Sequence, residues 1–187
     1  MISKPEHNLS DKELAQLVGS GDSRGQRELY DRYAGYLSAV VRRYLTDEDA
    51  AKDVLQEAFI CIYRRFSDFE YRGAGSLKAW MTRIVVNGAL HELRDRRVME
   101  DVERLPEPPS DEDPEVSDIP MAVLQRMIQG LPDGYRTVFN LYVFEQMPHK
   151  QIASLLGIKE NSSASQYLRA KALLAREIKE YRKTNDR

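Results

Sequence analysis

Residues 149–171, HKQIASLLGIKENSSASQYLRAK, are the stretch that decides most about the fold. A short apolar segment, residues 150–156, precedes a turn at Gly157 and a longer polar segment. Ile152 and Ile158 stand where a helix-turn-helix buries the residues of its turn. The pattern favours that motif, with an ordinary helical hairpin as the alternative.

The longer segment carries the residue types that contact bases and phosphates. Short polar residues at a helix start can enter a major groove, where Gln pairs with adenine and Arg with guanine. The alternative is a helix cap followed by an exposed face. The candidate DNA-binding residues of this segment are Ser162, Ser163, Ser165, Gln166, Arg169 and Lys171.

Helical periodicity continues on both sides of this stretch. Apolar residues recur every three or four positions, and no strand-like alternation or hairpin signal appears. Ser10 and Glu13 have capping-box spacing and predict a first helix. A third helix, capped by Thr46-Asp47, is expected to bury Leu55, Phe59, Ile62 and Phe66. In the second half, helices are predicted at 121–129, 133–145, 149–156 and 161–182.

Residues 100–120, EDVERLPEPPSDEDPEVSDIP, separate the two helical halves. They hold five of the eight prolines, nine acidic residues and one basic residue. Proline and like-charge repulsion keep such a segment extended. We therefore expect an all-α protein with two small helical domains, residues 1–99 and 121–187, joined by an extended acidic linker. The net charges, +1, −8 and +5 along the chain, make the C-terminal domain a candidate for binding a polyanion.

Two surfaces of the first domain are candidates for binding. One is the polar face of the third helix, which lies opposite its apolar stripe and carries Asp49, Asp53, Gln56 and Glu57. Carboxylates one turn apart suit catalysis, a metal site or protein docking, and a solvated face is the usual explanation of such charges. No Glu-x-x-His pair accompanies them.

The other surface is a loop with aromatic and basic residues, followed by a basic helix. Cations that follow phosphates and rings that stack on bases suit single-stranded nucleic acid. The alternative is that the rings belong to the core and the arginines to an ordinary surface. The residues are Phe69, Tyr71, Arg72, Arg83, Asn87 and Arg94.

Composition excludes several classes of protein. A single cysteine, Cys61, excludes an internal disulfide framework and a Cys-based zinc site. No apolar run is long enough to span a membrane, and the polar first ten residues are unlike a secretory signal. We expect a cytoplasmic protein without a metal, a cofactor or catalytic residues.

Several motifs, in this order, resemble the extracytoplasmic-function (ECF) sigma factors of bacterial RNA polymerase, and the resemblance covers nearly the whole chain. The motifs are DVLQEAF (53–59), WMTRIVVN (80–87), LPDGYRTVF (131–139), HKQIASLLGI (149–158) and SQYLRAK (165–171). A sigma factor binds core polymerase and directs it to promoters, which it recognises and melts.

The resemblance implies a role for each surface. Asp49, Asp53, Gln56 and Glu57 would dock on the clamp helices of the polymerase large subunit. The loop 69–75, with Arg83, Asn87 and Arg94, would bind the minus-ten element. The second domain would bind the minus-thirty-five element and touch the polymerase flap, and Arg136, His149 and Lys150 join its candidate contacts. An anti-sigma factor is the other partner implied, and no small-molecule substrate is expected.

Four positions depart from the family pattern. Asn161-Ser162 replaces a Gly-Thr pair that is common before the recognition helix, and Ala164 replaces a basic residue. Ala164 forms no polar base contact, so the preferred minus-thirty-five sequence should differ from that of members with a basic residue there. Pro148 replaces a common Ser cap, and proline is tolerated at a helix start.

Two other functions fit parts of the sequence. A free-standing helix-turn-helix regulator would explain the second domain but would leave the acidic face and the aromatic loop unused. A helical-bundle enzyme would need metal-ligand spacing or a nucleophile motif, and neither is present. Binding to core polymerase separates the first alternative from a sigma factor, and a metal assay tests the second.

Overall fold

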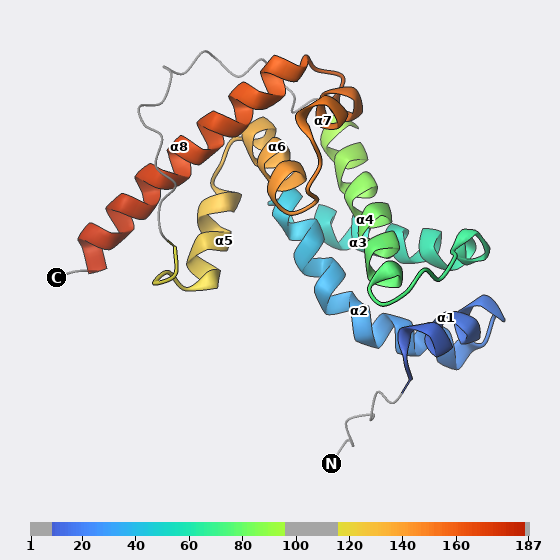
Figure 1. The fold of residues 1–187 in the computed structure, drawn as a ribbon. Helices are drawn as coiled ribbons and strands as arrows, with labels where there is room; N and C mark the ends of the chain where they lie inside the picture. Colours follow the sequence, from blue (N-terminus) through green and yellow to red (C-terminus); the bar gives the residue numbers. More distant parts are fainter. Residues whose placement is uncertain (1–8, 96–115, 186–187) are drawn as a thin grey trace. The chain divides into compact units, whose positions relative to one another are not determined.

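The regular elements are helices throughout the part of the chain that the structure describes. The computed structural model describes residues 9–95 and 116–185, and within them lie eight α-helices, one 3-10 helix and no strand (Figure 1). The prediction of an all-α fold is confirmed. The chain divides into two compact units, residues 1–92 and 93–187, and each is described by itself.

The first unit begins with a capped helix. Ser10 Oγ accepts a hydrogen bond from the Glu13 backbone N–H, and the Glu13 carboxylate accepts one from the Ser10 N–H, which is the capping box expected from the sequence. Asp22 and Asp47 cap the next two helices. The elements are α1 (Asp11–Gly19), α2 (Ser23–Tyr44), α3 (Glu48–Arg64), the 3-10 helix η1 (Phe66–Asp68) and α4 (Ser76–Asp95).

The core of this unit forms around α2, which contacts both α1 and α3. The Tyr33 hydroxyl donates to Asp11 at 2.6 Å and joins α2 to α1, and burial together with this carboxylate raises the pKa of Tyr33. The stripe predicted for the third helix is only partly correct, because Leu55 is half-buried and Phe66 lies in η1. Besides Phe59 and Ile62, α3 buries Ala50, Ala51, Val54 and Ala58.

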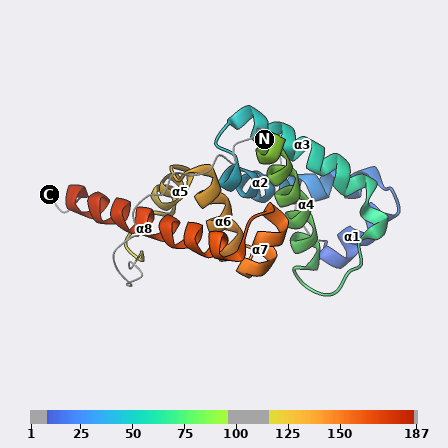
Figure 2. The same ribbon diagram turned by 90° about the horizontal axis from the view of Figure 1, so that it is seen from above.

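The second unit is built along its last helix. Its elements are α5 (Met121–Gln129), α6 (Asp133–Val143), α7 (His149–Leu156) and α8 (Glu160–Asn185). In both views α5 and α6 lie along α8 (Figure 1, Figure 2). Each of α5, α6 and α7 begins directly after a proline, whose carbonyl accepts an N–H of the first turn. The helix after Pro148 forms, as the sequence analysis expected.

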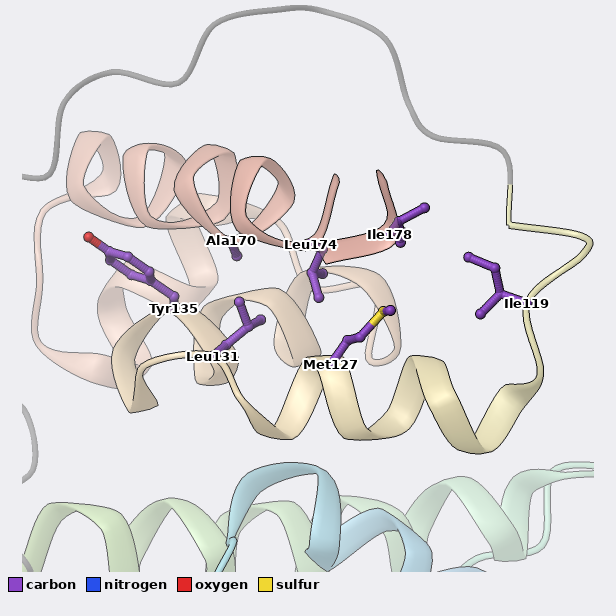
Figure 3. Close-up of a cluster of buried hydrophobic side chains, with 7 residues drawn as sticks. All are labelled: Ile119, Met127, Leu131, Tyr135, Ala170, Leu174 and Ile178. Carbon is purple, nitrogen blue, oxygen red and sulfur yellow. The ribbon is translucent and has the colours of Figure 1, made fainter. Parts of the chain in front are cut away.

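A cluster of buried apolar side chains holds α5 and α6 against α8 (Figure 3). One member is unexpected, because Ile119 precedes α5 and belongs to the range predicted as linker. Its side chain is only 6% exposed. Residues 116–120 therefore pack with the second unit, whereas positions 100–115 of the predicted linker lie outside the described residues. The cluster consists of Ile119, Met127, Leu131, Tyr135, Ala170, Leu174 and Ile178.

Candidate polymerase and nucleic-acid interfaces

The polar face of α3 is exposed along its whole length. Positions separated by three, four or seven residues share one side of a helix, so the four predicted docking residues point the same way. Asp49 also pairs with Lys52 at 2.9 Å, but both side chains are largely exposed, so the pair contributes little and leaves the face open. The exposed docking residues are Asp49, Asp53, Gln56 and Glu57.

An apolar residue that the sequence analysis missed lies within this face. Ile60 is four positions after Gln56 and its side chain is 56% exposed. Tyr30 of α2, 48% exposed, places its ring 4.7 Å from that of Phe59, the residue that precedes Ile60 in α3. An apolar centre with a charged rim is the usual composition of a protein interface. The sequence did contain a sign of this residue, because Ile60 follows Gln56 at the same helical spacing that relates the polar residues of this face to one another.

The loop between η1 and α4 rests on a group of three rings. Phe69 lies 5.6 Å from Phe66 and 5.2 Å from Trp80 between ring centroids. Trp80 meets Phe66 edge-on at 5.6 Å. Phe69 is half-buried as a result, so the expectation that it offers its ring to a base fits less well than a role in supporting the loop.

The rest of the loop presents polar groups and has a defined shape. Gly73 and Gly75 have φ angles of +114° and +83°, which side chains rarely adopt. Ser76 Oγ donates to the Gly73 carbonyl at 2.7 Å and accepts from the Arg72 N–H at 3.2 Å. Arg72 is exposed and pairs with Glu70 at 2.8 Å, and Tyr71 is half-buried. These contacts define the backbone of the loop, which leaves the Arg72 side chain exposed and the Tyr71 side chain half-buried at the surface.

Helix α4 presents the other predicted minus-ten residues along one exposed line. Arg83, Asn87 and Arg94 are separated by four and seven positions and are all exposed. Gly88 lies on a different side of the helix, where a Cβ would come within 3.3 Å of Val54 on α3. The packing against α3 thus leaves the line of Arg83, Asn87 and Arg94 accessible.

The helix-turn-helix prediction is confirmed by α7 and α8, which pack against each other. Gly157 ends α7 in the left-handed conformation at φ +70°, and the Ile158 N–H donates to the Ala153 carbonyl at 3.0 Å. Ile152 and Ala153 are buried, and Ile158 is half-buried. A short helix, a tight turn and a longer helix form the motif whose second helix enters the major groove.

Most predicted minus-thirty-five residues reach the surface of this motif. Lys150 and Ser165 are exposed, and the side chains of Ser162, Gln166, Arg169 and Lys171 are partly exposed. Leu168, which the sequence analysis did not select, is 55% exposed between Ser165 and Arg169. An apolar side chain at such a position can contact the methyl group of thymine. The sequence did contain a sign of Leu168, because this apolar residue does not share the helical spacing of the buried residues of α8.

Arg136 does not lie at this surface. Its side chain is 3% exposed and donates to the carbonyls of Gln129 and Leu131 at 3.0 and 2.7 Å. It also pairs with Asp133. The guanidinium thus satisfies carbonyls at the end of α5, and its expected DNA contact does not fit this burial.

Ser163 and His149 contact each other inside the motif. Ser163 is fully buried, and its Oγ lies 3.0 Å from His149 Nδ1. The His149 ring stacks on Tyr142 of α6 with centroids 4.5 Å apart and planes 9° apart. Together they connect α6, α7 and α8. Ser163 is therefore buried as a packing residue, which does not fit its expected base contact, while His149 keeps partial exposure.

Within residues 9–95 and 116–185, no group of three or more His, Cys, Asp or Glu side chains is arranged to hold a metal ion. Over the same described ranges, none of the helices combines the length and the apolar character needed to cross a membrane.

Comparison with known proteins gives these surfaces a family. Residues 29–98 match the model of sigma-70 region 2, and residues 121–174 match that of sigma-70 region 4. The RNA polymerase sigma-H factor of Pseudomonas aeruginosa is 31% identical over 175 residues, covering 86% of this chain and 90% of that protein. The chain belongs to the ECF sigma factors of RNA polymerase. The sigma factor is also 28% identical to the ECF sigma-E factors of Haemophilus influenzae and Escherichia coli K12, over 91% of its own length and 96% and 95% of theirs.

Solved structures show the same fold. A structure of CnrH in complex with the cytosolic domain of CnrY matches 90% of the sigma factor and 97% of that chain, at 23% identity and a TM-score of 0.50. RpoE from Bartonella quintana, in a complex with the anti-sigma factor NepR, matches 82% and 96% at 18% identity and the same TM-score.

Membership sets the activity of the sigma factor. It binds core RNA polymerase and directs promoter-specific initiation of transcription, as a family of non-catalytic initiation factors does. The region 2 match covers the α3 face, the loop and the line on α4, and the region 4 match covers the helix-turn-helix.

Proposed function

We propose that three surfaces of this sigma factor divide the work of initiation. The α3 face around Ile60 binds core polymerase, the loop 69–75 with the exposed line of α4 binds the minus-ten element, and α7 with α8 binds the minus-thirty-five element. The observation that carries this proposal is the exposure of the polar residues at helical spacing on each surface, with the apolar core on the opposite sides.

On the α3 face, Ile60 and Tyr30 supply the apolar contact area, and the carboxylates supply orientation. Apolar and aromatic groups near the centre of an interface carry most binding energy, whereas charges at the rim mainly raise the association rate. The acidic rim fits a basic partner surface. Asp53 and Glu57 therefore attract the polymerase, and Ile60 keeps it bound.

On the second surface, Arg83 and Arg94 contact phosphates and Asn87 contacts a base edge. Phosphate contacts give affinity and position, while base contacts give specificity. Melting needs one base to leave the stack, which costs a few kcal/mol and is offset when a pocket binds the flipped base. The loop that carries Tyr71 and Arg72 is the site for that base.

On the third surface, Ser165, Gln166 and Leu168 face base edges. Arg169 contacts a phosphate or a guanine, and Lys171 contacts a phosphate. Lys150 and Ser162 contact phosphates at the ends of the motif. Because Ala164 forms no polar contact, sequence preference rests on these neighbours.

An anti-sigma factor is a further proposed partner. The solved relatives include one complex with an anti-sigma factor, and the acidic-rimmed α3 face is a surface that such an inhibitor would block. The sigma factor has no catalysis of its own in this proposal. Since polymerase and promoter DNA are in the bacterial cytoplasm, we place its action there.

Titration of core polymerase with labelled sigma factor tests the central assignment. Asp53→Lys with Glu57→Lys should slow association and weaken binding at least tenfold, with more effect at low salt. Ile60→Ala should speed dissociation at any salt. Glu180→Lys, a single charge reversal on the exposed end of α8, is the control for the general effect of added positive charge. Unchanged affinity in both α3 variants, with helicity intact, would overturn the docking assignment.

A further inference from the structure

Residues 118 and 119, which precede α5, are held against the C-terminal part of α8. Ile119 packs among Met127, Leu174 and Ile178, and Figure 3 shows its side chain directed at this group. Its N–H donates to the Val116 carbonyl at 3.1 Å, which closes a turn. The Pro120 carbonyl then accepts from the first turn of α5. The chain therefore passes from this turn into α5 without a free residue between them.

An ion pair joins the same turn to α8. Arg182 donates from Nη2 and Nε to the two carboxylate oxygens of Asp118, at 2.7 and 3.1 Å. These hydrogen bonds lower the pKa of Asp118. The partners are 64 positions apart in the chain, so the contact is tertiary. A bidentate pair also fixes direction, which a single contact does not.

Ile119 contributes more to this attachment than the pair does. Both charged side chains remain substantially exposed, and exposed pairs are weak, whereas burial of an isoleucine is one of the stronger single contributions to folding. The hydrophobic contact thus holds the turn, and the pair orients it.

We propose that Asp118, Ile119 and Arg182 form an anchor that fixes where the linker leaves the second unit, and that the anchor determines which spacings between the two promoter elements the sigma factor accepts. The inference rests on the proposed function, in which each unit binds one element. It concerns residues outside every DNA-contacting surface.

The size of the effect follows from chain geometry. Arg182 lies about 25 Å along α8 from Ser165, at 1.5 Å of rise per residue, so the linker leaves the unit well away from the DNA-contacting end. Release of residues 116–120 would add up to about 17 Å of extended chain. One base-pair step rises about 3.4 Å, so the released chain spans several base pairs. An intact anchor keeps that length out of the tether.

The test is run-off transcription by the holoenzyme on a promoter series in which both elements are constant and the spacer changes by single base pairs. The wild type should favour one spacer. The measured quantity is the ratio of transcription from the preferred spacer to transcription from spacers that are two base pairs longer or shorter. Ile119→Ser should lower this ratio at least threefold. Asp118→Arg and Arg182→Asp should each lower it by a smaller factor, and the double exchange should restore it. Glu180→Arg, which breaks a neighbouring pair with Lys183, is the control that should change nothing.

The outcomes separate the anchor from the proposed function. A wild type whose output does not depend on spacer length would contradict the binding of two elements by two units. A spacer-dependent wild type with the same profile in all anchor variants would overturn the anchor alone. If Ile119→Ser loses binding to a minus-thirty-five duplex because the unit unfolds, the charge variants decide, since their exposed side chains leave the core intact. Failure of the double exchange to restore the profile would also count against the ion pair.

Discussion

Arg136 shows how a residue of the right type can serve a different purpose. A basic side chain near a helix-turn-helix suggests a phosphate contact, yet this one is buried and donates to two carbonyls at the end of α5. Charge alone does not distinguish a ligand-binding arginine from one that satisfies backbone acceptors. Only the tertiary contacts decide between them.

Arg136→Ala should therefore act on stability. Loss of charged hydrogen bonds to buried acceptors should destabilise the second unit by about 2–4 kcal/mol. Calorimetry of the full chain measures the shift, and Arg126→Ala, on the exposed side of α5, should leave the transition in place. An unchanged transition temperature combined with weakened minus-thirty-five binding would return Arg136 to the DNA-binding residues.

Replacing Gln166 or Lys171 with Ala should change DNA binding in different ways. Loss of Lys171 removes a phosphate contact, so affinity should fall evenly across sequences. The slope of log affinity against log salt concentration should become shallower by about one unit. Loss of Gln166 should relax preference at one position by about 1–3 kcal/mol. Binding to a library of minus-thirty-five duplexes at several salt concentrations measures both. Identical behaviour of the two variants would contradict this division.

At the scale of the element, helix α2 has a cap that responds to pH. Hydrogen bonds from the Arg24 side chain and backbone N–H lower the pKa of Asp22 to about 2. Because the folded-state pKa lies below the unfolded value of about 3.9, the cap stabilises fully above pH ~4, and the contribution is lost as pH falls towards 2.

NMR titration of the Asp22 carboxyl should place its midpoint well below that of an ordinary aspartate. Arg24→Ala should move the midpoint upward, because the side-chain hydrogen bonds are the largest cause of the shift. Arg27→Ala, an exposed change one turn further along α2, should not. A midpoint near 3.9 in the unaltered protein would contradict the cap.

Helix positions in the second unit were predictable because their signals are local. Prolines 120, 132 and 148 mark three helix starts and Gly157 marks a helix end, so predicted and observed ranges differ by at most three residues. The exposed candidates on α3 and α4 also follow from spacing alone. Ile119, Ser163 and Arg136 did not follow, because their burial depends on partners distant in sequence. Ile60 and Leu168 were missed because apolar residues were assigned to the core.

At the scale of the whole molecule, residues 100–120 stand out by their negative charge, because they contain nine acidic residues and only one basic residue. The resemblance to ECF sigma factors implies that such a linker would lie near the polymerase active centre, on the path of nascent RNA. Replacing Asp111, Glu112, Asp113 and Glu115 with Ser keeps every proline but removes four charges. Positively charged channel walls should then attract the segment less.

The expected result is an altered ratio of abortive to full-length transcripts at low salt. The difference should shrink at high salt, since the screening length falls from about 10 Å at 0.1 M to about 3 Å at 1 M. Asp111→Glu with Asp113→Glu preserves the charge and should behave as the wild type. Equal ratios for the neutral and native linkers at both salt concentrations would reduce the segment to a spacer.

Helix α8 is continuous from Glu160 to Asn185, so the side chains proposed to contact DNA and those that fill the core keep a fixed angle to one another around the helix axis. A single inserted or deleted residue near position 172 would turn one set about 100° relative to the other. Under the proposed function, exchanging residues 162–169 between relatives at equal length, with Ser163 kept, should therefore transfer promoter preference. A graft that changes this length would aim the new side chains away from the groove even if each of them were correct.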